Sequence, residues 1–177
     1  QYYSSYYPYG GFGGAQNITI LNKMVQSAKG NPALPSYEGL ALFLKASYGI
    51  SATLDMGDIP YSEAGMAEEG ITQPKYDKQA DVFVSVLADL KAAEAKFAMG
   101  VNFTGDIMMG GNAAKWRRLC NAMQLRVLNV ISKKATPAQK TRFAEIVTAG
   151  NLMTGNTDNF QLSYLDNTNA TYPFYNG

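Results

Sequence analysis

Five acidic residues fall in or near one expected loop, and paired carboxylates are the groups that glycosidases use for acid–base chemistry. They are Asp55, Asp58, Glu63, Glu68 and Glu69. A glycosidase needs two carboxylates held at a fixed separation across one bond, and sequence spacing does not show that separation. Carboxylates at helix ends or in water are far more common. We therefore predict helix-end contacts and solvated loop charges rather than a catalytic pair.

Other catalytic and metal chemistry is restricted by what the chain lacks. The sequence has no histidine, so Ser-His and Cys-His pairs and the commonest metal ligand are absent. Its single cysteine, Cys120, has no partner for an internal disulfide and lies on the apolar stripe of an expected helix, as a small core residue would. The oxygen-rich stretch 166–169 could suit calcium but lacks EF-hand spacing. We predict that the chain is not an enzyme and has no cofactor and no metal site.

Aromatic and amide side chains gather near both ends of the chain, and this combination suits sugar binding. Flat rings stack on the apolar faces of sugars, while polar groups bond to their hydroxyls. The candidate ligand-binding residues are Tyr6, Tyr7, Tyr9, Asn169, Tyr172, Phe174 and Tyr175. The alternative is that these rings pack against parts of a longer protein.

A second group of residues surrounds the only tryptophan, Trp116, and could form an anion site. It consists of Lys115, Arg117, Arg118 and Arg126. Trp116 lies on an apolar stripe, so we expect it in the core, with the basic stems beside it and their heads in water. Fifteen basic residues oppose fourteen acidic ones. Without a clustered basic face, we expect no nucleic-acid partner.

Apolar residues recur at helical spacing, so the elements that position these side chains are expected to be helices. The pattern predicts helices at 17–29, at 35–54 after a Pro35-Ser36 cap, from an Asp77 cap to Gly100, from Asn112 to Ile131, and at 137–150 after a Thr136 cap. The last carries Phe143, Ile146 and Val147. Long loops separate the helices at 57–76 and 100–111. The predicted fold class is all-α.

The chain is expected to form a single domain over residues 1–177. It divides into an aromatic and glycine-rich loop at 1–16, a helical core at 17–150 and a loop-rich segment at 151–177. No apolar run reaches the roughly 18 residues needed to span a bilayer. Both ends look cut, so we expect that a longer protein is truncated at both ends and that any lipid anchor lies outside this chain.

Three stretches resemble motifs of the SusD/RagB family of Bacteroidetes outer-membrane proteins. Residues 56–64 read MGDIPYSEA and resemble a "GDxPYxEA" motif. Residues 74–79, PKYDKQ, resemble the start of the family's following helix. Residues 115–126, KWRRLCNAMQLR, resemble its "kW.kfaNsLrlR" stretch. Order and spacing are kept from about residue 35 to 160.

The resemblance implies tetratricopeptide-like helix pairs that support long loops. It also implies a non-catalytic lipoprotein on the extracellular face of the cell outer membrane, which passes glycans or peptides to a SusC-like TonB-dependent transporter. Members are much longer than this chain. An alternative is a structural module that docks on the transporter without binding a ligand itself. We expect Asp58, Pro60, Tyr61 and Trp116 to stabilise helix ends and packing.

Overall fold

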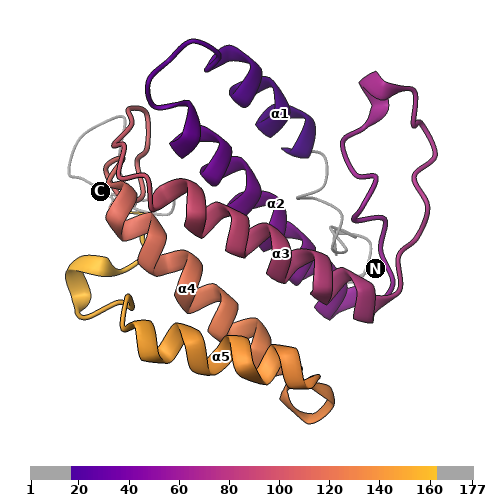
Figure 1. Cartoon of the computed structure of the whole chain (residues 1–177). Coiled ribbons are helices and arrows are strands. Elements are labelled where there is room, and N and C mark those ends of the chain that lie inside the picture. The colour runs from indigo at the N-terminus through magenta and orange to yellow at the C-terminus, as the bar shows by residue number, and fades with distance from the viewer. Residues whose placement is uncertain (1–16, 163–177) are drawn as a thin grey trace, which may run out of the picture.

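The computed structural model describes residues 17–162, and these residues form five α-helices joined by loops (Figure 1). The helices are α1 (Ile18–Ser27), α2 (Leu34–Met56), α3 (Gln79–Phe97), α4 (Ala113–Val130) and α5 (Pro137–Ala149), and short 3-10 turns lie at Ala67–Glu69, Ser132–Lys134 and Asn156–Asp158. Within this range there is no strand, only an isolated antiparallel bridge between Ile59 and Asp77. The all-α prediction is therefore confirmed.

Each helix packs mainly on the next one along the chain. α3 lies between α2 and α4, while α1 packs on α2 and α5 packs on α4. Figure 1 shows α1, α3 and α5 running in similar directions, with α2 between the first two and α4 between the last two. The fold is thus a series of helix pairs, as the resemblance implied.

The core lies along α2, α3 and α4, where the predicted stripes are buried. On α3 the buried stripe is Val82, Val86, Leu90, Ala93 and Phe97, at three- and four-residue steps. Trp116 of α4 is 1% exposed, stacks on Phe97 at 5.8 Å between ring centroids and meets Phe43 of α2 edge-on at 5.2 Å. Cys120 is completely buried. Both residues are core residues, as predicted.

Two helices start where the sequence predicts, and each start has a side-chain cap. The Asn112 side chain accepts a hydrogen bond from the Lys115 amide at the start of α4. α5 begins with a reciprocal capping box between Thr136 and Gln139 and ends at Gly150, whose φ is +65°. These caps depend on residues three positions apart, so sequence shows them directly.

Two other predicted caps are wrong. Ser36 does not cap α2, because its hydroxyl donates to the Val101 carbonyl across the core. Asp77 does not cap α3, because Asp58 from the preceding loop accepts the Gln79 amide at 2.9 Å. The Ser36 hydroxyl bonds to Val101 and the Gln79 amide bonds to Asp58. Both partners are distant in sequence, so helical spacing does not show them.

The apolar residues of α5 differ in exposure. Ile146 is 2% exposed, but Phe143 and Val147 are 41% and 48% exposed. Among the described helices α5 packs mainly on α4, so only one edge of its apolar face is covered. No helix among residues 17–162 has the length and apolarity that would let it cross a membrane.

Candidate functional site

The Asp77 carboxylate fastens the long loop that follows α2. It accepts hydrogen bonds from the Tyr61 amide at 3.1 Å and the Ser62 amide at 2.6 Å, and from the Ser62 hydroxyl at 2.9 Å. Burial alone would raise the pKa of Asp77, but these bonds outweigh it and hold the pKa below 3.8. The carboxylate is therefore a fixed anion that shapes the loop, and its accepting oxygens are occupied.

Tyr61 lies in the core beneath the same loop, 2% exposed. Its hydroxyl donates to Asp89 Oδ2 at 2.7 Å, and Lys45 Nζ lies 4.9 Å from the ring centroid and 3.8 Å from the same oxygen. Burial, with the Asp89 charge second, raises the pKa of Tyr61, so the phenol stays protonated as a donor. The expected packing role of Tyr61 is confirmed.

The loop at 100–111 is organised around Asp106. Its carboxylate accepts the indole Nε1–H of Trp116 at 2.7 Å and the amides of Met108, Met109 and Gly111 between 2.8 and 3.2 Å. Burial alone would raise the pKa of Asp106, but the four donors together have the larger effect and hold the pKa below 3.8. Trp116 thus stabilises a loop as well as the core.

Of the five acidic residues considered as a catalytic pair, three make ion pairs or hydrogen bonds and two are exposed. Asp58 pairs with Lys78 at 3.4 Å and caps α3, as helix-end contacts predict. Glu63 holds the Lys75 amide at 2.9 Å and Glu68 pairs with Lys23 at 2.5 Å. Asp55 and Glu69 are exposed. Residues 17–162 hold no group of three side chains suited to a metal, and the 166–169 stretch lies outside the described residues.

Three of the basic residues beside Trp116 form ion pairs or hydrogen bonds, and the prediction of a solvated head is wrong for Arg118, which pairs with a buried carboxylate. Arg118 makes a two-point contact with Asp158 at 2.6 and 3.1 Å, and Arg117 Nε lies 2.6 Å from Glu94. Lys115 donates to the Thr157 carbonyl. Asp158 is 3% exposed, and the Arg118 guanidinium holds its pKa at about 2. These contacts fasten segment 154–158 onto α4.

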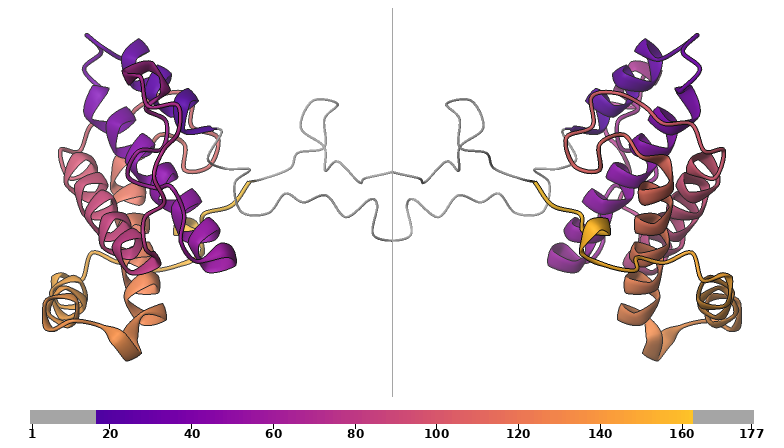
Figure 2. Two further views of the ribbon diagram at one scale, coloured as in Figure 1. Left: turned by 90° about the vertical axis from the view of Figure 1, so that its right-hand side faces the viewer. Right: turned by 90° about the vertical axis from the view of Figure 1, so that its left-hand side faces the viewer.

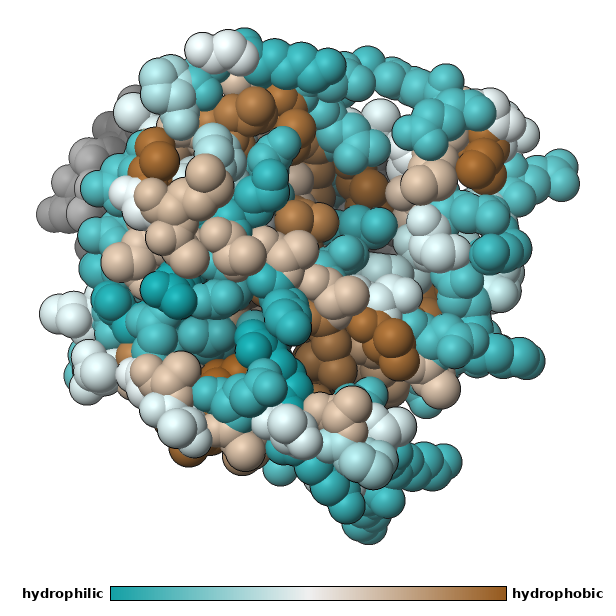
Figure 3. Space-filling view, viewed as in Figure 1, coloured by the Kyte–Doolittle hydropathy of each residue, from teal (hydrophilic) through white to brown (hydrophobic). Residues whose placement is uncertain are grey.

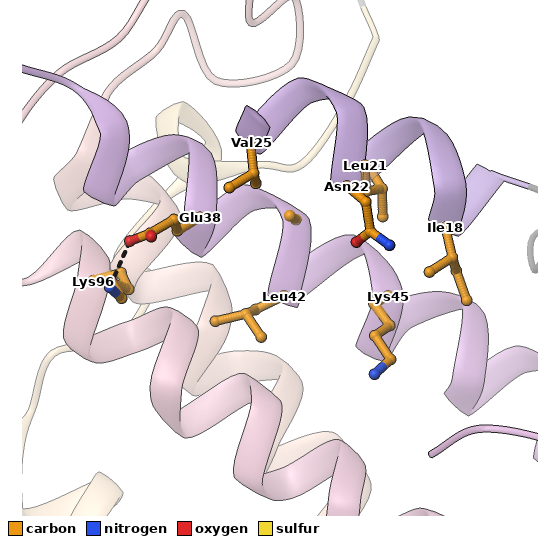
Figure 4. A pocket seen from close by; sticks show the side chains of 9 residues that line it. Ile18, Leu21, Asn22, Val25, Glu38, Leu42, Lys45 and Lys96 are labelled. Atoms are coloured by element: carbon orange, nitrogen blue, oxygen red, sulfur yellow. Dashed lines mark hydrogen bonds and ion pairs between the residues drawn. The ribbon is translucent and has the colours of Figure 1, made fainter. Parts of the chain in front are cut away.

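A trough of about 410 Å³ opens on the molecular face where α1 and α3 flank α2, and it is the first candidate for a binding site (Figure 4). Its lining residues are Ile18, Leu21, Asn22, Val25, Glu38, Ala41, Leu42, Lys45 and Lys96. We call it the α1–α3 trough. The trough was not predicted from the sequence, although its lining residues on α1 and on α2 each follow i, i+3, i+4, i+7 spacing.

The α1–α3 trough has an apolar floor and a polar rim. Lys96 pairs with Glu38 at 2.5 Å across one end, and Asn22 and Lys45 stand nearer the other (Figure 4). A smaller hollow of about 220 Å³ continues it toward Gly65 and Glu68 and shares Lys45 in its lining. None of the nine lining side chains is aromatic, so the trough offers apolar contact and hydrogen bonds but no ring for stacking.

The seven ligand-binding residues predicted from the sequence lie outside the described residues. They are Tyr6, Tyr7, Tyr9, Asn169, Tyr172, Phe174 and Tyr175. The described chain begins and ends on the same side of the molecule (Figure 2). Near its end, Phe160 is 41% exposed and meets Trp116 edge-on at 5.7 Å.

Comparison with known families identifies one match. Residues 2–177 match the family model SusD-like_2, described as "Starch-binding associating with outer membrane". No curated protein matches the chain.

Several solved structures share the fold. A SusD homologue from Bacteroides fragilis is 41% identical, with a TM-score of 0.82 over 89% of this chain. An outer-membrane protein from Bacteroides vulgatus, described as involved in nutrient binding, is 37% identical with a TM-score of 0.80 over 92%. A chitin-binding protein is 28% identical with a TM-score of 0.68 over 85%. The chain spans about a third of each relative, 34%, 36% and 33% of their lengths.

Proposed function

The chain belongs to the SusD-like family, and from this premise we propose that it is a non-catalytic part of a glycan-binding protein of the outer membrane. The observation that carries the proposal is the match to a starch-binding family over residues 2–177. Relatives described as nutrient-binding and chitin-binding support the same class of ligand. The ligand is a glycan or another nutrient oligomer, bound by shape and stacking.

The site is proposed at the aromatic ends of the chain rather than in the α1–α3 trough. The trough has no ring in its lining, whereas tyrosines offer both a flat apolar face for stacking and a hydroxyl for hydrogen bonding. The two described ends lie on one side of the molecule, so the segments that carry Tyr6, Tyr7 and Tyr9 and those that carry Tyr172 and Tyr175 join the fold on that side (Figure 2).

The non-catalytic part of the proposal is supported by the chemistry of the described residues. Structural hydrogen bonds occupy Asp58, Tyr61 and Asp77 of the family-like motifs and Asp106 of the 100–111 loop. The buried phenol of Tyr61 stays protonated, and the chain has no histidine. Such groups hold loops in place and do not transfer protons to a substrate.

The cellular location, the transporter partner and the mode of membrane attachment in this proposal follow from the family resemblance. The protein acts on the extracellular face of the outer membrane and delivers its ligand to a SusC-like TonB-dependent transporter. Contact with the membrane is through a lipid anchor outside this chain.

The test is a thermal-shift screen of the chain against oligosaccharides and peptides, followed by calorimetry with any ligand found. A ligand that binds only the native state raises the unfolding midpoint, and the stabilisation grows with the logarithm of its concentration relative to Kd. Tyr172→Ala and Tyr175→Ala should abolish the rise, while Tyr76→Ala, a 65% exposed tyrosine of the 57–76 loop, should preserve it. No rise with any glycan, together with co-purification with a transporter, would instead favour the docking module.

A further inference from the structure

α1 is short and buries few side chains. It has ten residues, and isolated helices shorter than about 12–15 residues are marginal in water. Within α1 only Ile18 and Leu21 are buried, and among the described helices α1 packs mainly on α2. Elements with few buried apolar contacts are the ones that open most readily from a folded protein. Contacts beyond α2 therefore matter for whether α1 stays in place.

The tip of the 57–76 loop, residues 64–70, supplies such contacts. Figure 1 shows this loop beside the end of α1 that follows the N-terminus. The Asn22 side chain of α1 donates to the Gly65 carbonyl at 3.2 Å. A Cβ on Gly65 would lie 2.5 Å from Ile18 Cγ2, so the loop backbone approaches α1 as closely as a glycine allows.

An ion pair lies on the outer side of the same contact. Lys23 Nζ of α1 lies 2.5 Å from Glu68 Oε1, and both side chains are more than half exposed. Exposed ion pairs contribute little to stability. This pair can therefore be removed without unfolding the chain, which makes it a suitable place to test the contact.

The base of the loop is held by the core and not by α1. Asp77 accepts hydrogen bonds from the Tyr61 and Ser62 amides, and the Tyr61 hydroxyl donates to Asp89 of α3. The loop is thus fixed at its base on one side and rests with its tip on α1. A segment fixed in this way is built as a strap across the helix that it touches.

α1 also forms one wall of the α1–α3 trough. Figure 3 shows hydrophobic residues gathered between α1 and α3 on the face that Figure 1 presents. Release of α1 would remove this wall and expose the apolar surface of α2 beneath it. The 1–16 stretch continues into α1 through Asn17, so the strap also holds the point at which that stretch joins the fold.

We infer that the 57–76 loop is a strap that holds α1 on α2, and that α1 and the tip of the loop open together while α2, α3 and α4 stay folded. Opening breaks the packing of α1 on α2 and leaves the core around Trp116 intact. The inference rests on contacts within this chain. It depends neither on glycan binding nor on what covers the troughs.

Native-state hydrogen exchange of the chain tests the strap, with the protection of the α1 amides compared with that of the α4 amides. In the parent, α1 should be at least about tenfold less protected than the centre of α4. Glu68→Gln removes the ion pair and should lower the protection of α1 by about two- to fivefold. Glu69→Gln is the matched control, because Glu69 is exposed and forms no ion pair within residues 17–162. Equal effects of the two variants on α1 would overturn the inference.

Two glycines of the loop tip test the close approach. Gly65 and Gly70 both have positive φ, +81° and +88°, so alanine at either position strains the tip. Only at Gly65 would the added Cβ meet α1, since nothing lies within 4 Å at Gly70. Gly65→Ala should lower the protection of α1 by tenfold or more, and Gly70→Ala by about fivefold. Equal losses would show that contact with α1 does not matter.

A core variant tests whether α1 opens while the core stays folded. Val127 of α4 is 1% exposed, and α1 makes no substantial contact with α4. Val127→Ala should lower the protection of α4 by about tenfold, because it leaves a cavity, and should leave α1 unchanged. Circular dichroism checks that each variant is folded. An equal loss of protection in α1 and α4 would show that α1 opens only when the whole chain unfolds, and would overturn the inference.

Discussion

The indole Nε1 of Trp116 donates a hydrogen bond to Asp106 Oδ2 at 2.7 Å, while the same ring stacks on Phe97 at 5.8 Å. One side chain therefore joins the helical core to the 100–111 loop. The carboxylate also accepts hydrogen bonds from three backbone amides of that loop. Removing the indole donor should therefore destabilise both the helical core and the loop.

Trp116→Phe should lower the free energy of unfolding by about 2–4 kcal/mol. The variant loses a hydrogen bond to a charged group, worth about 1.5–3 kcal/mol, and part of a buried ring. Urea unfolding followed by circular dichroism measures the loss. Tyr76→Phe, at a 65% exposed position, is the control and should change stability by less than about 0.5 kcal/mol. A Trp116→Phe variant as stable as the parent would mean that the bond contributes nothing.

Gly111→Ala should destabilise the chain by about 2–4 kcal/mol, and Gly110→Ala by only about 1 kcal/mol. Both glycines have positive φ, +70° and +65°, so both variants incur left-handed strain. Only at Gly111 would a Cβ collide with backbone, the Phe103 carbonyl; at Gly110 nothing lies within 4 Å. Equal losses of stability in the two variants would show that the positive φ alone sets the cost and that the close approach of Gly111 to the Phe103 carbonyl adds nothing.

Gly49→Ala should destabilise by about 1–3 kcal/mol despite the better helix propensity of alanine. A Cβ at Gly49, inside α2, would overlap the ring of Tyr61, which is buried and bonded to Asp89. The propensity gain of about 1 kcal/mol offsets only part of this cost. Thermal unfolding should show the drop. Gly155→Ala, where nothing lies within 4 Å, serves as a control and should leave the midpoint nearly unchanged. A raised midpoint for Gly49→Ala would contradict the predicted overlap.

Stability should fall as the pH is lowered below about 4, and Asp158 should account for part of the fall. The folded pKa of Asp158 is about 2, below its usual 3.8, because Arg118 is bound to it. A lowered folded pKa gives stability that is present above pH 3.8 and is lost as the pH falls toward 2. The pKa values of Asp77 and Asp106 are lowered too, with the same sign.

Asp158→Asn isolates this contribution. The variant should be less stable than the parent at pH 6, since Arg118 loses its anion, and the two stability curves should converge near pH 2. Urea midpoints measured from pH 6 to pH 2 test this. Parallel curves over the whole range would show that Asp158 does not titrate with folding.

Helices and local caps could be predicted because their causes lie within a few residues of one another. The buried residues of α3 recur every three or four positions, and the capping box joins Thr136 to Gln139, three positions away. The burial of Trp116 and Cys120 followed from the same periodicity. The family resemblance rested on motif order in the chain, and the family model confirmed it.

Long-range partners could not be predicted in this way. The Asp77 carboxylate could have capped α3, and only the folded loop shows that the Tyr61 and Ser62 amides occupy it while Asp58 takes the cap. Arg118 likewise lies 40 positions from Asp158, and no local rule pairs them. Such partners depend on where the loops return to the helices.

The sequence by itself determined the helical class of this protein, its buried stripes, its lack of histidine chemistry and its family, because these depend on residue type and short spacing. Which carboxylates hold loops, which arginines are paired, and that α3 and α5 stand apart over α4 with a trough of about 520 Å³ between them depend on the tertiary structure. The physical reason is that helical periodicity sets which face of a helix is apolar, whereas the packing of neighbouring helices sets how much of that face is covered.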